Sequence, residues 1–220
     1  MDKDKIIDAI TNRILQELGL DDDRHNFHDA HGISIAISAR HVHITREVFE
    51  QIYGSGRDLT AYTMLYQPGE FAAAEVITLV GPRLRAIQDV RILGPFRKAT
   101  QIELSRTDGV LLGIEPPVRR SGDLAGSEPI VLVGPAGSIS LKEGAICANR
   151  HIHISPEDAR RFNVKDNDIV KIRIPGIRAL TFENVQIRVN ENYLLQMHLD
   201  TDDANAAGIR SGDLGELIKD

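Results

Sequence analysis

Two short pairs of histidines are the residues of this chain best suited to chemistry. His41 and His43 form the first pair, and His151 and His153 form the second. Each pair lies in the pattern R-H-[VI]-H-I-[ST], and the second copy follows the first by 110 residues (151 minus 41), half of the 220-residue chain. Because side chains at positions i and i+2 of a strand share a face, both imidazoles of a pair can reach one metal ion.

A second local match predicts a third ligand for each pair. The segment Gln101 to Leu104 resembles Gln196 to Leu199, and in this register Glu103 and His198 occupy equivalent positions. Three protein ligands with an open fourth position are typical of catalytic metal sites. Zinc is the first expectation, although these ligands also suit Mn, Fe, Co and Ni. The sequence therefore predicts two divalent metal ions, held by two related sets: His41, His43 and Glu103; His151, His153 and His198.

The same residues also fit a purely structural interpretation. Histidines on strands can be hydrogen-bonded inside two barrels, and Glu103 can pair with an arginine. The repetition of the pair, together with a matched third ligand, favours metal binding over that interpretation.

The elements that must position these residues are mostly short strands, which Gly, Pro and Asp residues separate. Short strands at this spacing are typical of barrels rather than of a doubly wound sheet. Helices are expected over Arg46 to Tyr53, Pro156 to Phe162 and Asp202 to Ala207, with Thr45 and Ser155 capping the first two. The expected strands are residues 33–37, 75–80, 90–93, 101–104, 130–133, 139–141, 168–174, 185–189 and 193–199.

The predicted fold is mainly β with short helices: two similar β-barrel domains from an internal duplication, plus an N-terminal amphipathic helix. In that helix Ile6, Ile7, Ile10, Ile14 and Leu18 form one apolar stripe, which can pack on the body or dock on a partner as a detachable tag. The expected division is a helix or tag at 1–20, a linker at 21–31, a first barrel at 32–115, a crossover at 116–127 and a second barrel at 128–220.

Composition excludes several other classes of protein. The chain has 26 basic and 32 acidic residues, a formal net charge of −6, which argues against a general nucleic-acid binder. No apolar run approaches the roughly 20 residues that span a bilayer. The single cysteine, Cys147, excludes an internal disulfide and is expected to be a small buried residue rather than a nucleophile. No Gly-rich phosphate loop and no G-x-S-x-G elbow occurs.

Arginines that precede Glu103 indicate an anionic substrate. Arg91 and Arg97 lie at successive intervals of six residues before this carboxylate. A guanidinium in a metal-containing cleft matches phosphate or carboxylate, since it can bind either with two parallel hydrogen bonds. For Arg83 and Arg85 a solvated surface position is the expectation, whereas for Arg97 a functional role is equally favoured.

These motifs resemble the phosphate propanoyltransferase family, the PduL-type phosphotransacylases. The resemblance rests on the two histidine motifs, on Q-P-G-E-F-A-A at 67–73 and on V-R-I-L-G-P-F-R at 90–97, and it covers about residues 32–215. It implies two β-barrels, two metal ions, usually zinc, and the exchange of acyl-CoA plus phosphate with acyl phosphate plus CoA. The acyl group would be propanoyl or a similar short chain, which implies a place in propanediol degradation.

The resemblance also implies roles for individual residues. The set with Glu103 would hold the metal that meets the CoA sulfur, and the set with His198 would hold the second metal. Arg97 would be catalytic and bind phosphate. Three further positions match contacts to CoA or phosphate: Ser38, Arg91 and Asn205. Family members often carry a lysine shortly before the Q-P-G segment, but this chain has Thr63-Met64, so that coenzyme contact is not transferred.

An amphipathic N-terminal extension targets such enzymes into bacterial microcompartments, and residues 1–20 resemble that tag. The implied partners are the shell or other cargo, and a second copy of the chain, with neither nucleic acid nor membrane. The implied location is the microcompartment lumen, within the cytoplasm. Two other interpretations stay open: a cupin-like oxygenase or isomerase with all ligands on one metal, and a non-catalytic microcompartment adaptor whose two halves are stapled by metals.

Overall fold

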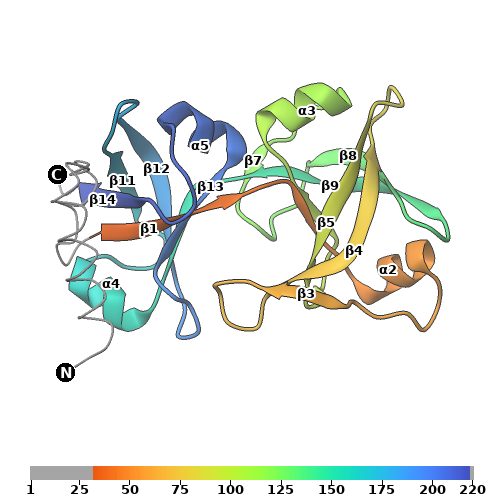
Figure 1. The fold of residues 1–220 in the computed structure, drawn as a ribbon, viewed down its shortest axis with the longest axis horizontal. Coiled ribbons are helices and arrows are strands. Elements are labelled where there is room, and N and C mark those ends of the chain that lie inside the picture. The colour runs from red at the N-terminus through yellow and green to blue at the C-terminus, as the bar shows by residue number, and fades with distance from the viewer. Residues whose placement is uncertain (1–31, 219–220) are drawn as a thin grey trace, which may run out of the picture.

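The computed structural model describes residues 32–218, which form two β-barrels side by side (Figure 1). The expected helix at 1–20 and linker at 21–31 lie outside the described residues. One barrel closes through six strands in the order β1 (Gly32–Ser38), β13 (Gln196–Asp200), β10 (His151–Ile154), β12 (Leu180–Val189), β11 (Ile169–Ile174) and β14 (Leu214–Ile218).

The other barrel also closes through six strands. The order is β4 (Phe71–Val80), β5 (Ala86–Gly94), β2 (His41–His43), β6 (Gln101–Glu103), β9 (Ser138–Ala148) and β8 (Glu128–Val133), and β8 pairs back with β4. Two short strands, β3 (Ala61–Met64) and β7 (Val118–Arg119), extend the sheet from β4 and β9. The prediction of a mainly β protein with two similar barrels is confirmed.

Each half of the chain contributes strands to the barrel that the other half mainly builds: the first half contributes β1, and the second contributes β8 and β9. The strand before the first histidine pair, β1, pairs with β13 and β14, and the strand before the second pair, β9, pairs with β6 and β8. Strand membership therefore does not follow the expected division into residues 32–115 and 128–220. The two-residue connections Ala39-Arg40 and Asn149-Arg150 lead from β1 to β2 and from β9 to β10, and so carry the chain from one barrel into the other.

The two barrels share one pattern of strand pairing. β2 runs parallel to β5 and antiparallel to β6, and β10 runs in the same way beside β12 and β13. The residues between the paired histidines, Val42 and Ile152, are completely buried in separate cores. The duplication predicted from the sequence is thus a duplication of topology, and it places the two histidine strands in equivalent positions.

Two helices follow the histidine strands directly, as expected. The Thr45 side chain accepts a hydrogen bond from the Val48 amide at the start of α2 (Arg46–Tyr53), and Ser155 caps α4 (Pro156–Phe162). Asp200 caps α5 (Thr201–Ala207), a helix that begins one residue earlier than the predicted start at Asp202. These caps fix the ends of the strands that carry candidate ligands.

One helix was not predicted from the sequence. α3 (Arg106–Leu112) begins with a reciprocal capping box between Ser105 and Asp108, and it ends at Gly113 in the left-handed conformation. Within residues 32–218, none of the helices is long and apolar enough to cross a membrane.

Candidate metal and substrate site

The first predicted set of ligands comes together between β2 and β6. Glu103 lies opposite His41 in the antiparallel ladder. Its Oε2 is 3.5 Å from His41 Nε2, and its Oε1 is 3.9 Å from His43 Nε2. Both histidines are buried, with 7% of each exposed. The three side chains offer ligand atoms that lie within 4.8 Å of one another.

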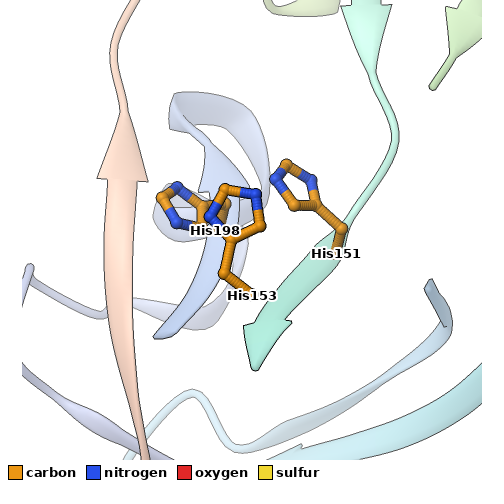
Figure 2. A group of neighbouring side chains, drawn as sticks. All are labelled: His151, His153 and His198. Atoms are coloured by element: carbon orange, nitrogen blue, oxygen red, sulfur yellow. The ribbon is translucent and has the colours of Figure 1, made fainter. Parts of the chain in front are cut away.

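The second predicted set comes together between β10 and β13, as Figure 2 shows. His198 lies opposite His151, and their rings stack with centroids 5.0 Å apart. The His153 centroid is 4.6 Å from that of His198. The ligand atoms of this set also lie within 4.8 Å of one another. The structure therefore contains two separate three-ligand groups, one on each barrel.

One histidine of each set has its tautomer fixed by the backbone. His41 Nδ1 is 2.8 Å from the carbonyl oxygen of Ala39, and His151 Nδ1 is 2.8 Å from that of Asn149. A carbonyl oxygen can only accept, so Nδ1 carries the proton and donates it. The lone pair is then on Nε2, the atom directed toward the other ligands, which is the usual arrangement of a metal-binding histidine.

Burial keeps the second set of histidines neutral. Desolvation, aided by the charge of neighbouring side chains, lowers the pKa of His151 to about 3, of His153 to about 2 and of His198 to about 4. Both ring nitrogens of His153 and the Nε2 of His198 are buried without a hydrogen-bond partner among residues 32–218. Leaving such atoms unpaired is costly, so the group fits a bound cation.

Both sets line one cavity of about 360 Å³, a volume in the range of small-molecule sites. Three residues predicted to contact the substrate also line it: Ser38 at the end of β1, Arg91 on β5, and Arg97 in the loop after β5. The fourth, Asn205, is exposed on α5 and is not among the lining residues. The strand crossing between the barrels thus runs along the wall of the cavity.

Arg97 lines the cavity and acts electrostatically on both sets of ligands. Its charge lowers the pKa of His43 in one set and of His153 in the other, in each case as a smaller cause than burial. Its Nη2 donates a hydrogen bond of 2.6 Å to Glu70 Oε1. This pair is part exposed, with 39% and 30% of the two side chains accessible, so the guanidinium can exchange Glu70 for another anion.

Several residues that shape this site were not predicted. Gln101 Nε2 donates to Glu103 Oε1 at 2.6 Å, which orients that carboxylate. Tyr193 stacks on His153 with centroids 4.0 Å apart. Gln67 exchanges two hydrogen bonds with the backbone of Leu194, which joins the loops of the two barrels over the cavity. Gln101 had a sequence signal, since the repeated Q-x-E and Q-x-H segments align it with Gln196, whereas Tyr193 had none.

Cys147 is not part of the site. It is 5% exposed and lines neither this cavity nor the small one beside it. Burial and the neighbouring Asp200 raise its pKa to about 12, so it stays a thiol. The expectation of a small buried residue is confirmed.

The fold and the site define a class: a two-barrel protein in which two potential metal-binding groups and several arginines face one cavity. The comparisons with known proteins agree with this description. The profile of the family "Phosphate propanoyltransferase" matches residues 34–210. A phosphate propanoyltransferase of Thermotoga maritima is 50% identical over 189 residues, which are 86% of this chain and 90% of the relative.

Two further relatives carry the same name. The protein of Lachnoclostridium phytofermentans is 46% identical over 98% of this chain and 100% of its own length. That of Listeria monocytogenes is 42% identical over 97% of this chain and 94% of its own length. The chain belongs to the phosphate propanoyltransferase family and is an enzyme of the acyltransferase class.

Proposed function

We propose that the chain transfers a short acyl group, propanoyl or similar, between CoA and inorganic phosphate in the cavity that both barrels line. One divalent cation, most simply zinc, would bind at each of the two ligand triads, His41–His43–Glu103 and His151–His153–His198. The observation that carries the proposal is that both triads and Arg97 face the same space. Family membership supports the reaction class, and the unpartnered imidazole nitrogens support the cations.

The phosphate end of the reaction is assigned to Arg97. Phosphate carries more charge than a carboxylate and presents a matching pair of oxygens to a guanidinium. Phosphate can therefore replace Glu70 as the partner of Arg97. Until phosphate binds, the Glu70 carboxylate holds the guanidinium in the cavity. Arg97 then holds the phosphate between the triads and neutralises part of its charge.

The transfer itself needs no covalent intermediate with the protein. An oxygen of phosphate attacks the thioester carbonyl carbon, a new C–O bond forms, the C–S bond breaks, and CoA leaves as its thiolate; the reverse reaction follows the same path. The cations, when bound, would supply Lewis-acid stabilisation of the carbonyl oxygen and of the thiolate, worth several kcal/mol. The chain's own contribution is to orient the ligands through Ala39, Asn149 and Gln101 and to hold phosphate on Arg97.

Activity assays with single variants test this proposal. We expect His41→Ala and Arg97→Ala to lose most turnover of acyl-CoA with phosphate, and Arg97→Ala also to require more phosphate for half saturation, by about tenfold to a hundredfold. The exposed Arg85→Ala is the matched control. Unchanged turnover in Arg97→Ala would remove its phosphate role, and a wild-type protein inert with both substrates would overturn the proposal.

Metal counting, metal removal and CoA binding address the alternatives. A cupin-like enzyme would bind one cation per chain through ligands of one barrel, whereas the candidate ligands lie in two groups on two barrels. A non-catalytic adaptor whose two halves are held together by metals would lose stability when the metals are removed, and it would bind no CoA. Acyl chain length is set by the fit of the cavity, and one methylene is worth about 1–3 kcal/mol in such a pocket, so propanoyl-CoA and acetyl-CoA should be compared directly.

We also propose that residues 1–20 act as a tag that directs the enzyme to a microcompartment shell or to other cargo. The support is the apolar stripe of the sequence, which leaves charged residues on the other side. Deletion of this segment is expected to leave transacylation intact while abolishing encapsulation and reducing self-association. A truncated protein that still co-purifies with shells would contradict the proposal.

A further inference from the structure

Arg188 is a residue of the cavity wall for which the protein itself supplies no partner. It lies on β12 directly beside His153 in the parallel ladder, and it is one of the residues that line the cavity. Its Nε is buried and has no hydrogen-bond partner among residues 32–218. No carboxylate in that part of the chain lies within ion-pair distance of its guanidinium.

The other arginines of the cavity differ from Arg188 in this respect. Arg40 pairs with Asp108 at 2.8 Å, and Arg97 pairs with Glu70 at 2.6 Å. Arg91 donates to the carbonyl oxygens of Ala73 and Ala74 at 3.0 and 2.9 Å. Arg188 is thus the only arginine lining the cavity whose guanidinium has no such partner within residues 32–218.

A half-buried, unpartnered guanidinium carries a cost that a ligand can offset. Taking a charge out of water is expensive unless an opposite charge and hydrogen bonds replace the water. Burial lowers the pKa of Arg188, and the positive charges of Arg120 and Arg97 act in the same direction. An anion in the cavity would supply both the charge and the acceptors.

The internal duplication shows that the strand does not require this arginine. His43 of the first barrel lies beside Leu93 of β5, just as His153 of the second lies beside Arg188. Leu93 and Arg188 therefore occupy equivalent positions, and both line the same cavity. Since leucine serves the fold at this position, the arginine is explained by what it binds.

We propose that Arg188 is a second guanidinium for the phosphoryl group, binding it from the barrel opposite to Arg97 beside the His151–His153–His198 triad. This inference rests on the proposed function, because it names the substrate group that occupies this end of the cavity. The CoA diphosphate is the other anion available, but the pantetheine arm separates it from the sulfur, whereas Arg188 lies beside a candidate metal ligand at the reacting end. Phosphate is therefore the occupant that the position favours.

The test compares Arg188→Leu, which reproduces the residue of the first barrel, with Arg188→Lys. Arg173→Leu, an exposed arginine on the neighbouring strand β11, is the matched control. We expect Arg188→Leu to raise the KM for phosphate about tenfold to a hundredfold, the loss produced by removing one charged hydrogen-bond donor. The KM for acyl-CoA should stay within about twofold, Arg188→Lys should fall between wild type and Arg188→Leu, and Arg173→Leu should match wild type.

Two measurements without turnover separate binding from structure. Inorganic phosphate should raise the thermal midpoint of the wild-type protein, with and without zinc, and should raise that of Arg188→Leu much less. Without phosphate, Arg188→Leu should be at least as stable as wild type, because an uncompensated charge is removed. A structural arginine would instead make the variant less stable.

The possible outcomes distinguish failure of the Arg188 inference from failure of the proposed function. A raised KM for acyl-CoA with an unchanged KM for phosphate would overturn the inference in favour of the CoA diphosphate. A destabilised Arg188→Leu that still responds to phosphate as wild type does would overturn it in favour of a structural role. If the wild type transfers no acyl group, the proposed function fails, while equal phosphate stabilisation of wild type and Arg188→Leu would overturn the assignment of Arg188.

Discussion

The two barrels repeat the same topology but differ at the positions that face the cavity. Both present a histidine pair, a backbone carbonyl that fixes one tautomer, and a third ligand on the antiparallel neighbour. The first barrel places Glu103 and Leu93 where the second places His198 and Arg188. A cation bound by the first group would have its charge reduced by a carboxylate, whereas one bound by three neutral imidazoles would keep its full charge.

This difference indicates that the two copies of the scaffold bind different parts of the substrates. The more positive group, with Arg188 beside it, suits phosphate, and the less positive group, with Leu93 beside it, suits the less charged thioester end. The duplication supplies the positions of the ligands, and substitutions at a few cavity-facing positions distinguish their tasks.

Exchanging the third ligands is the strongest way to break the comparison. If the groups have distinct tasks, Glu103→His and His198→Glu should each still bind metal but lose turnover by about a hundredfold. Removal of a ligand in Glu103→Ala or His198→Ala should cost more, about a thousandfold. Turnover and metal content measured on the same preparations would check this. Full activity in the exchange variants would mean that the two groups are interchangeable.

Acidification should affect the metal-free second barrel in a predictable direction. An unfolded histidine takes up a proton near its ordinary pKa of 6.5, whereas folded His151, His153 and His198 do so only at about 3, 2 and 4. Between these values the unfolded chain binds more protons, so the free energy of unfolding is at its full value above about pH 6.5 and falls as the pH is lowered toward 4.

Urea unfolding of the metal-free protein at about pH 7.5 and about pH 5 measures this loss. His198→Gln should show a smaller loss than wild type, because it lacks one of the three groups. An equal loss in both proteins would show that the pH dependence arises elsewhere.

The ion pairs beside the two strand crossings should differ modestly in strength. Arg40 binds Asp108, which is 1% exposed and also caps α3, whereas Arg150 binds Asp203, which is 20% exposed. We expect Asp108→Asn to lower the free energy of unfolding by about 2–3 kcal/mol and Asp203→Asn by about 1 kcal/mol. Denaturant midpoints compare the two, and a larger effect at Asp203 would reverse the predicted order.

Much of the site could be predicted because it depends on local patterns. The period of two on a strand places His41 beside His43, and the repeated Q-x-E and Q-x-H segments identify Glu103 and His198 as the strand neighbours. The capped helices α2 and α4 followed from Thr45 and from Ser155-Pro156, residues that satisfy the first amides of a helix.

What the sequence did not predict depends on contacts between distant segments. The placement of β1 in the second barrel, and of β8 and β9 in the first, is invisible to periodicity, which reports the faces of a strand but not its partner. Arg188 was missed because its meaning lies in the absence of a counter-ion and in its equivalence to Leu93, and both require the strand register. The signal for α3 was present in Ser105, Asp108 and Gly113, but the helix is only two turns long and lacks a long apolar period.

The central claim, that each copy of the scaffold holds one cation at a shared cavity, is tested most directly by metal stoichiometry. Metal content per chain should be measured for wild type, for Glu103→Ala and for His198→Ala, alongside thioester formation from acyl phosphate and CoA. We predict two ions in the wild type, about one in each variant, and thioester formation only in the protein that holds both. A single ion per wild-type chain, or undiminished thioester formation after the metals are removed, would contradict the account.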